Sequence, residues 1–197
     1  MKLAREFYTR EDAITVSRDL LGKLLVVPTD DGGRVSGMIV ETEAYLGTID
    51  KAAHTFGGRR TARNEITYAD GGHVYVFFIY GLYHQLNVVT GPVELPHVTL
   101  IRALEPVDGI EIMDRRRGSK RGRELTSGPG KLCMAMDIDR RFNGKDFLAD
   151  KIWIEKYKSI RGEDILSGPR IGIDYSEEFA DVPWRFWIRN NNFVSKK

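Results

Sequence analysis

The sequence predicts an α+β fold, in which a curved antiparallel or mixed β-sheet forms the core and helices flank it. Segments rich in β-branched and aromatic residues outnumber those with helical periodicity. The helical segments do not alternate regularly with the strands, which disfavours a doubly wound parallel sheet. The 197 residues contain no internal repeat or low-complexity tract, so a single domain spanning residues 1–197 is expected.

The first expected element is a helix from about Arg10 to Leu21. Thr9 is placed to cap it, Asp12 adds negative charge to its first turn, and Gly22 is placed to end it. The remaining elements follow in order: strands at 23–28 and 34–45 around a Gly-rich turn, a long structured loop at 46–72, strands at 73–79 and 83–89 around a tight turn at 80–82, a strand at 98–103, helices within 106–117 and at 127–136, late strands at 152–155 and 187–188, and a loose tail from 190.

Several classes of protein are disfavoured by composition. The N-terminus becomes charged too early for a signal peptide, and no apolar run approaches the length of a membrane span, so a cytoplasmic protein is expected. Cys133 is the only cysteine, which excludes an intramolecular disulfide and a multi-thiolate metal site. Neither a cofactor nor a metal is expected, because no convincing partner ligands accompany the four histidines, His54, His73, His84 and His97.

Positive charge is concentrated in two places, although the net charge is only +2. The first cluster is Arg59, Arg60 and Arg63, and the second comprises Arg115, Arg116, Arg117, Lys120, Arg121 and Arg123. Two basic clusters beside a pocket would suit a phosphate backbone. The alternative for the second cluster is an ordinary solvated loop.

One predicted strand carries an unusual polar face. Alternation places Glu41, Glu43 and Tyr45 together, although carboxylates are rarely buried unless they are paired. An edge strand with a solvated face is the simplest explanation. The residues that follow favour a functional one, because His54, a Gly-Gly-Arg turn and an aromatic-rich segment add a stacking pocket and phosphate contacts to a candidate general base.

With these residues in view, the chain resembles the alkyladenine (3-methyladenine) DNA glycosylase family of the mammalian type. The resemblance covers nearly the whole chain, and the order and spacing of the motifs make it specific. Its most informative pieces are Val-Glu-Thr-Glu-Ala-Tyr at 40–45, Ala-Ala-His at 52–54, Gly-Gly-Arg at 57–59 with Arg-Asn at 63–64, Tyr-Gly-Leu-Tyr at 80–83 ending at Asn87, Arg-Ala-Leu-Glu-Pro at 102–106 and Ser-Gly-Pro-Gly-Lys-Leu-Cys at 127–133.

The resemblance implies hydrolysis of the N-glycosidic bond of damaged purines in double-stranded DNA, which begins base excision repair. Such an enzyme rotates the nucleotide out of the duplex, because a stacked base cannot be reached. No lysine matches a nucleophile, so lyase chemistry is not expected. The chain lacks the extension that precedes the catalytic domain of larger relatives, and we expect a minimal monomeric version that binds no membrane and is nucleoid-associated if prokaryotic.

The resemblance assigns catalysis to Glu43 as the general base that activates water, with Arg102 near that water and the target phosphate. Glu41 is left as a structural or solvent-facing carboxylate. Tyr80 corresponds to the wedge that fills the gap in the duplex, with Leu82 beside it at the tip of a protruding β-hairpin.

The implied base pocket has Tyr45 on one face of the flipped purine, and His54 and Phe77 on the other. Relatives commonly carry tyrosine where this chain has Phe77, so a hydrogen bond from that phenol is lost. Asn87 would exclude normal guanine. Candidates for contacts with the DNA backbone are Arg59, Tyr83, Ser127 and Lys131, the last two at a helix N-terminus.

Two other functions fit part of the pattern. A non-catalytic nucleic-acid-binding module would use the hairpin tip and the basic clusters, but it gives Glu43 no task. A sugar hydrolase could use Glu41 and Glu43 as a carboxylate pair, but the basic clusters do not favour it. The sequence does not rank alkylated purines, hypoxanthine and ethenoadenine as substrates.

Overall fold

The computed structural model describes residues 1–79 and 81–196. Among these residues, eight strands form one sheet in which neighbouring strands run antiparallel. The strands are β1 (Leu24–Pro28), β2 (Arg34–Tyr45), β3 (Val74–Ile79), β4 (Tyr83–Thr90), β5 (His97–Asp108), β6 (Trp153–Glu155), β7 (Ile165–Gly168) and β8 (Arg185–Ile188). The α-helices are α1 (Arg5–Tyr8), α2 (Ala13–Asp19), α3 (Ile110–Arg116) and α4 (Pro129–Met136). The α+β prediction is confirmed.

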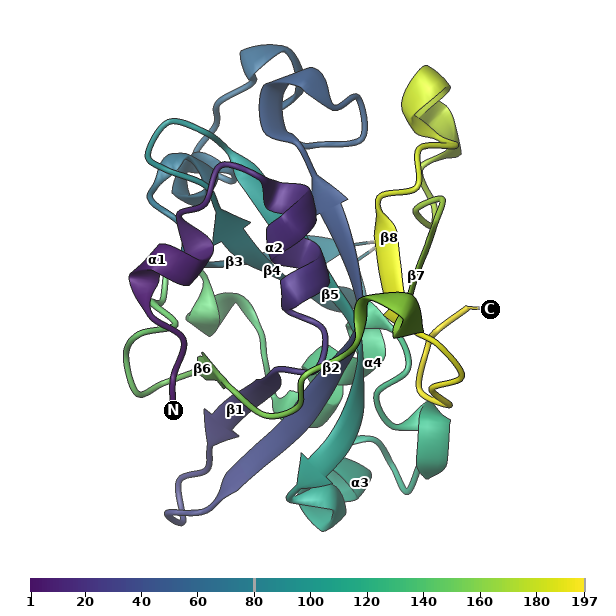
Figure 1. The fold of residues 1–197 in the computed structure, drawn as a ribbon. Helices are drawn as coiled ribbons and strands as arrows, with labels where there is room; N and C mark the ends of the chain where they lie inside the picture. Colours follow the sequence, from purple (N-terminus) through teal and green to yellow (C-terminus); the bar gives the residue numbers. More distant parts are fainter. Residues whose placement is uncertain (80, 197) are drawn as a thin grey trace.

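Strand β2 lies at the centre of the sheet, whose main order is β3-β4-β5-β2-β1-β6. It pairs with β1 and β5, and its segment Glu41–Glu43 also pairs with β8, which in turn pairs with β7. The long strands β2 and β5 curve across the molecule together (Figure 1). An edge strand with a solvated face is therefore excluded for β2, and both of its carboxylates are fully buried.

Three register shifts interrupt the pairing of β2 with β5, and two of them flank Glu41. Ile39 pairs with Leu104 and Glu41 with Ala103, while Thr42 pairs with Ile101. Val40 on β2 and Arg102 on β5 are thus the extra residues of two bulges. Bulges re-aim side chains and are frequent beside active sites. Arg102, at the bulge on β5, contacts both acidic residues of β2.

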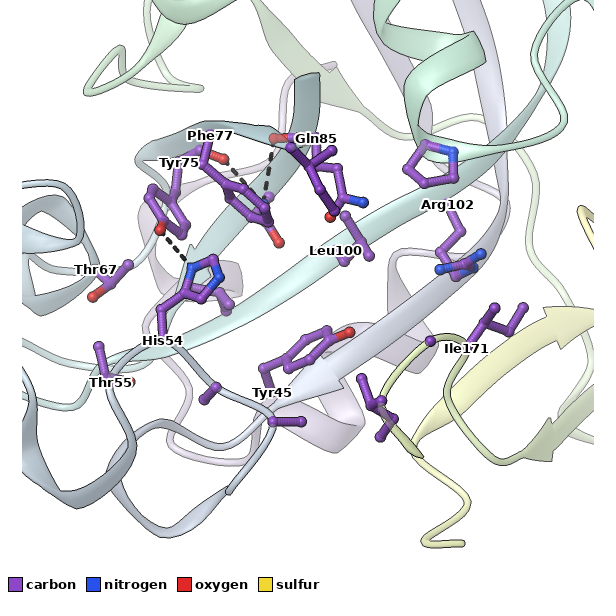
Figure 2. Close-up of a pocket in the computed structure, with 18 of the residues that line it drawn as sticks. Tyr45, His54, Thr55, Thr67, Tyr75, Phe77, Gln85, Leu100, Arg102 and Ile171 are labelled. Carbon is purple, nitrogen blue, oxygen red and sulfur yellow. Dashed lines mark hydrogen bonds between the residues drawn. The ribbon is translucent and has the colours of Figure 1, made fainter. Parts of the chain in front are cut away.

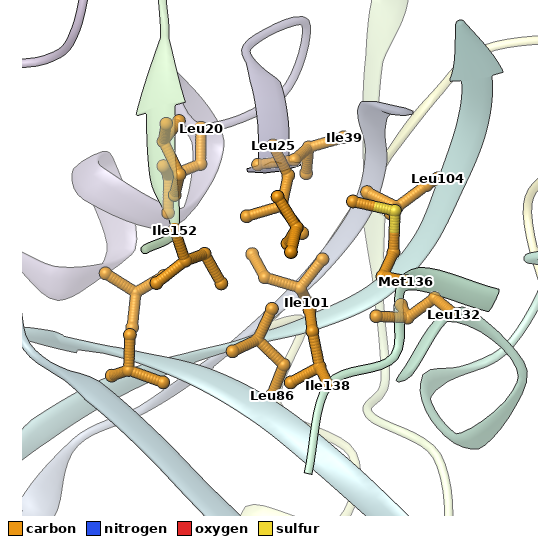
Figure 3. Packing of buried hydrophobic residues seen from close by; sticks show 14 of the residues in the cluster. Leu20, Leu25, Ile39, Leu86, Ile101, Leu104, Leu132, Met136, Ile138 and Ile152 are labelled. Carbon is orange, nitrogen blue, oxygen red and sulfur yellow. The ribbon is translucent and has the colours of Figure 1, made fainter. Parts of the chain in front are cut away.

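A large hydrophobic cluster supports the sheet. Side chains from α2, such as Val16, belong to the same cluster as Leu132 and Met136 of α4. Figure 3 shows Leu132 and Met136 beside residues of the central strands, including Ile101 and Leu104. Burying one large aliphatic side chain stabilises the fold by about 1.5–3 kcal/mol. The core thereby provides a rigid base for the residues on the other side of the strands.

The N-terminal helix differs from the prediction. It is shorter than expected and corresponds to α2, while a separate short helix, α1, precedes it. Asp12 rather than Thr9 caps α2, since the Asp12 carboxylate accepts hydrogen bonds from the backbone N–H groups of Ile14 and Thr15. Both residue types are good caps, and Thr9 is already used at the end of α1.

The helix predicted within 106–117 is α3, but the strand before it is longer than the predicted 98–103. Pro106 is still part of β5, which continues to Asp108. The turn into α3 is made by Gly109 at a φ of 68°, and an added Cβ there would meet the carbonyl oxygen of Arg34 at 2.7 Å. Glycine is therefore required by both the backbone conformation and the close approach of β2.

The loop from 46 to 72 is structured, as predicted, and contains three short 3₁₀ turns. Asn64 ties it together: its side chain accepts a hydrogen bond from the backbone N–H of Thr61 and donates to the carbonyl oxygens of His54 and Arg59. This network holds His54 in place.

The tail from residue 190 is not loose, because Val194 is only 1% exposed. The short strand β7 was not predicted.

The predicted hairpin of β3 and β4 is confirmed, with Phe77 opposite Gln85 and Ile79 opposite Tyr83. No helix in the described part of the chain is both long and apolar enough to cross a bilayer.

Candidate active site

A cavity of about 280 Å³ opens beside the central strands. Its wall is formed by β2, β3, β4 and β5, by the loop that carries His54, and by the segment 171–175 (Figure 2). The volume is close to the lower end of the range for small-molecule sites, roughly 300–1,000 Å³. The residues that line it are Tyr45, Ala52, Ala53, His54, Thr55, Thr67, Tyr75, Phe77, Ile79, Gln85, Asn87, Pro96, Val98, Leu100, Arg102, Pro129, Ile171, Gly172, Ile173 and Tyr175.

Glu43 lies directly behind this wall and is fully buried. The Tyr45 hydroxyl donates to its Oε2 at 2.9 Å, and the backbone N–H of Ile171 donates to its Oε1 at 2.8 Å. Arg102 Nη1 lies 3.3 Å from the same Oε1. All three partners are donors that belong to residues lining the cavity, so the carboxylate is an acceptor adjacent to the pocket.

Arg102 joins the two carboxylates of β2. Besides its contact with Glu43, its Nε lies 3.3 Å from Oε1 of Glu41. Burial lowers the pKa of Arg102, but the negative charges of Glu43 and Glu41 outweigh this and raise the pKa overall. The guanidinium therefore stays charged.

Glu41 faces away from the cavity. Its Oε1 accepts a hydrogen bond from Arg185 Nη1 at 2.9 Å, and its Oε2 accepts one from the backbone N–H of Ser195 at 2.6 Å. Arg185 also donates to the carbonyl oxygen of Lys196. The C-terminal segment is thus attached to the same ion-pair network, and Glu41 is the structural carboxylate that the sequence suggested.

Tyr45 forms one wall of the pocket. The guanidinium of Arg170 lies 4.6 Å from the centroid of its ring. Arg170 is not among the residues that line the cavity, and it forms an ion pair with the buried carboxylate of Asp50. Burial, together with the charge of Glu43, raises the pKa of Tyr45 well above its usual value. The phenol therefore remains protonated and able to donate to Glu43.

The opposite wall is formed by aromatic rings from β3 and the His54 loop. His54 meets Phe77 edge to face, with ring centroids 4.5 Å apart, and its Nδ1 lies 2.8 Å from the hydroxyl of Tyr75. Burial, then the charges of Arg63 and Arg59, lower the pKa of His54 to about 4. The imidazole is therefore neutral at physiological pH. Figure 2 shows Tyr45 on one side of the cavity and His54 with Phe77 on the other.

Asn87 lines the pocket and is almost fully buried. Its Nδ2 donates to the carbonyl oxygen of Tyr75 at 3.2 Å and more weakly to that of Gln85 at 3.4 Å. The bond to Tyr75 crosses the β3–β4 hairpin and holds the side chain in one orientation.

The remaining predicted residues lie around the mouth. Leu82, at the hairpin tip, is 70% exposed, whereas Tyr80 lies outside the described residues. Tyr83 is partly exposed and packs on Gly130 of α4, where an added Cβ would meet its ring at 3.0 Å. Ser127 is buried, and its hydroxyl has no hydrogen-bond partner in the part of the chain that the structure describes.

The two charged residues predicted to contact the DNA backbone, Arg59 and Lys131, have different surroundings. Arg59 is exposed at the edge of the His54 loop. Lys131 forms an ion pair with Glu124 at 2.7 Å, so DNA would have to compete for its charge. Neither residue lines the cavity.

Sequence reasoning missed several residues of the pocket. Tyr75 could have been found, because it is two residues before Phe77 and shares its face of β3. Gln85 could have been found from hairpin register, since it lies opposite Phe77. Ile171 lies in an Arg-Ile-Gly motif at 170–172 that also resembles the family, but neither it nor Tyr175 was assigned to the pocket.

An aromatic slot beside a buried carboxylate and guanidinium defines a binding site for a flat ring next to an acid–base group. The chain matches the methylpurine-DNA glycosylase (MPG) family over residues 6–192 and belongs to it. It is therefore a DNA glycosylase, a hydrolase that cleaves N-glycosidic bonds.

Similar curated proteins are bacterial. The chain is 48% identical to a protein of Clostridium novyi (strain NT), with 100% of this chain and 99% of that protein covered. It is 49% identical to one of Clostridium acetobutylicum (99% and 98% covered) and 47% identical to one of Bacillus cytotoxicus (100% of both covered). All three bear the name "Putative 3-methyladenine DNA glycosylase".

Proposed function

We propose that this chain is a monofunctional glycosylase that rotates a damaged purine out of double-stranded DNA and hydrolyses its glycosidic bond with a water activated by Glu43. This is the first step of base excision repair. Residues 1–197 would act as one catalytic domain, monomeric on DNA, with an active-site layout like that of the mammalian type. The observation that carries the proposal is the buried Glu43–Arg102 pair next to a slot between aromatic rings.

The carboxylate of Glu43 has room for one more partner. A carboxylate has about four acceptor positions. Two on Oε1 face Ile171 and Arg102, and one on Oε2 is used by Tyr45. A shift of Tyr45 when a base enters would open the remaining position on Oε2 to water. Such alignment commonly tightens only in the substrate complex.

Hydrolysis then proceeds at the sugar. Glu43 takes a proton from the water as its oxygen bonds to the anomeric carbon, and the bond to the base breaks with its electron pair leaving on the base. The negative charge of Glu43 stabilises the positive charge that develops on the sugar. Arg102, which reaches the cavity, would orient the water and contact the target phosphate.

The aromatic walls suit damaged purines. Alkylation at a ring nitrogen makes the base positive, and a cation is attracted to the faces of Tyr45 and Phe77. His54, neutral because its pKa is about 4, does not repel it. Asn87, held rigidly, would exclude the amino group of normal guanine.

Base flipping would use the hairpin tip. Leu82 exposes a large apolar side chain at the hairpin tip, where it could enter the duplex, and Tyr80 is the wedge that the family resemblance implies. Arg59, Tyr83, Ser127 and Lys131 would contact the DNA backbone around the mouth. The hydroxyl of Ser127 at the start of α4, which no described residue engages, supports such a contact.

The direct test is release of free base from DNA. The wild-type protein should liberate methylated purines from alkylated duplex DNA, leaving abasic sites that are cut only by added alkali or lyase. Binding to the lesion without base release would favour the non-catalytic module. Strand cleavage by the protein alone would contradict the monofunctional assignment.

A further inference from the structure

The buried ion pair of Asp50 and Arg170 has no task in the catalytic scheme above. The two residues are 120 positions apart in the chain, and both side chains are 0% exposed. Arg170 Nη2 donates to Oδ1 of Asp50 at 2.9 Å, and Nη1 donates to Oδ2. A buried ion pair is by itself weak evidence of a stabilising role, because desolvation offsets much of the attraction. The other contacts of the pair indicate a different role.

The arginine of the pair holds the aromatic residue of one pocket wall. Its guanidinium lies 4.6 Å from the ring centroid of Tyr45 and 5.1 Å from that of Trp184. Its Nη1 also donates to the carbonyl oxygen of Ala44 at 3.0 Å. A planar guanidinium can stack on rings and donate from its edge at the same time. Arg170 therefore contacts both the ring of Tyr45 and the backbone directly before it.

The carboxylate of the pair holds the loop that leads to the opposite wall. Asp50 Oδ2 accepts a hydrogen bond from the backbone N–H of Leu46 at 3.1 Å, and Oδ1 accepts one from that of Ala52 at 3.0 Å. Ala52 lines the cavity, as does His54 two residues later. The pair thus connects the strand that carries Tyr45 with the start of the loop that carries His54.

Two donors to Glu43 come from residues that Arg170 holds. Ile171 follows Arg170 in the chain, and its backbone N–H donates to Glu43 Oε1 at 2.8 Å. The hydroxyl of Tyr45, whose ring Arg170 contacts, donates to Glu43 Oε2 at 2.9 Å. Misplacement of a reacting group by about 1 Å can slow a reaction by roughly 10²-fold. Anchoring of Arg170 therefore bears directly on the alignment of the candidate general base.

We propose that Asp50 and Arg170 are positioning residues, which keep the Tyr45 hydroxyl and the Ile171 N–H aligned on Glu43. Neither residue of the pair lines the cavity, so both act through the residues that they hold. The inference rests on the proposed glycosylase function and adds two residues to its machinery.

The test uses two changes in the pair and one control. Arg170→Lys keeps the positive charge, but one ammonium cannot stack on two rings and also donate to Ala44 and to both oxygens of Asp50. A double variant, Asp50→Asn with Arg170→Gln, removes both charges together, so that no buried charge is left unpaired. Arg5→Lys is the matched control, because it weakens an arginine–carboxylate pair with Asp146 whose residues do not line the pocket.

The first measurement is single-turnover release of base from a duplex with one 7-methylguanine, at saturating protein, together with a gel-shift titration and thermal melting. The maximal rate constant does not depend on the fraction of protein that is folded, so a general loss of stability leaves it unchanged. Both changes in the pair should lower this rate constant by about tenfold or more, while lesion affinity stays within about threefold of the wild type. Arg5→Lys should lower the melting temperature and leave the rate constant within about twofold.

An unchanged maximal rate constant in either folded variant of the pair would overturn the inference, and so would an equal loss in Arg5→Lys. The second measurement is independent of catalysis. Hydrogen exchange of the Ile171 amide is followed by NMR on the DNA-free protein. It should be slow in the wild type and in Arg5→Lys, and at least about tenfold faster in Arg170→Lys, because exchange reports local opening.

The two measurements separate this inference from the proposed function. Absence of 7-methylguanine release by the wild-type protein would overturn the glycosylase proposal itself. Release by the wild type combined with unchanged exchange of the Ile171 amide in Arg170→Lys would overturn only the positioning role of the pair.

Discussion

The two carboxylates of β2 invite comparison. Glu41 and Glu43 are two residues apart, both are fully buried, and both lie 3.3 Å from the same arginine, Arg102. Yet the other partners of Glu43 are the cavity residues Tyr45 and Ile171, whereas those of Glu41 are Arg185 and the backbone of Ser195.

Burial and pairing with Arg102 therefore do not distinguish the two carboxylates. Glu41 has a strong cation, Arg185, dedicated to it, together with a backbone donor from the C-terminal segment. Glu43 shares the guanidinium of Arg102 with Glu41, but its other two donors, Tyr45 and Ile171, line the cavity. The difference between the two carboxylates lies in the residues that surround them, and substitution can test whether it sets their roles.

The largest effect is expected from Glu43→Gln. The amide keeps the shape of the side chain and loses its basicity, so excision should fall by roughly 10²–10⁴-fold while lesion binding stays within a few-fold. Single-turnover base release and a gel-shift titration measure the two quantities. Turnover like that of the wild type would remove Glu43 from the mechanism.

Glu41→Gln should act mainly on stability. Removing one partner of a buried ion pair leaves the other charge uncompensated, which costs about 3–5 kcal/mol, and here the stranded charge is Arg185. Denaturant unfolding should show this loss, and excision by the folded fraction should exceed that of Glu43→Gln. A stable Glu41→Gln variant that excises no base would reverse the two roles.

A smaller effect should follow from changing the C-terminal segment. Ser195→Pro removes the backbone N–H that donates to Glu41, and a hydrogen bond to a charged group contributes about 1.5–3 kcal/mol. Ser195→Ala keeps this N–H and is the matched control. Unfolding free energies should fall only for the proline variant, and equal values for both variants would show that the segment does not support Glu41.

The smallest effect concerns the basic segment around α3. Arg116 and Arg117 donate to the carbonyl oxygens of Ala135 and Leu125, so they are structural, and replacing them would confuse stability with binding. The cleaner variant replaces Arg115, Lys120 and Arg121 with alanine. If these cations neutralise phosphates, the slope of log binding constant against log salt should fall in magnitude by about 0.9 for each phosphate that the variant leaves unneutralised on duplex DNA. An unchanged slope would identify a solvated loop.

Local pattern was sufficient for much of the sheet. The limits of β2, Arg34–Tyr45, agree with the prediction because a Gly-rich turn and a long run of strand-forming residues mark them. The start of α2 could not be predicted as well, since Thr9 and Asp12 are both good caps, and Thr9 ends the short helix α1 while Asp12 caps α2. The limit of β5 depended on Gly109 approaching β2.

The sequence by itself determined the fold class, the family and the residue types of the site, because these follow from periodicity and from motifs that are contiguous in the chain. Only the tertiary structure shows that the partners of Glu43 line the pocket, whereas Glu41 is bound by Arg185 and the C-terminal segment. That arrangement depends on the bulge at Arg102 and on donors brought from residues 171, 185 and 195. Contacts so distant along the chain leave no periodic trace in the sequence, and they exist only once the sheet has closed around β2.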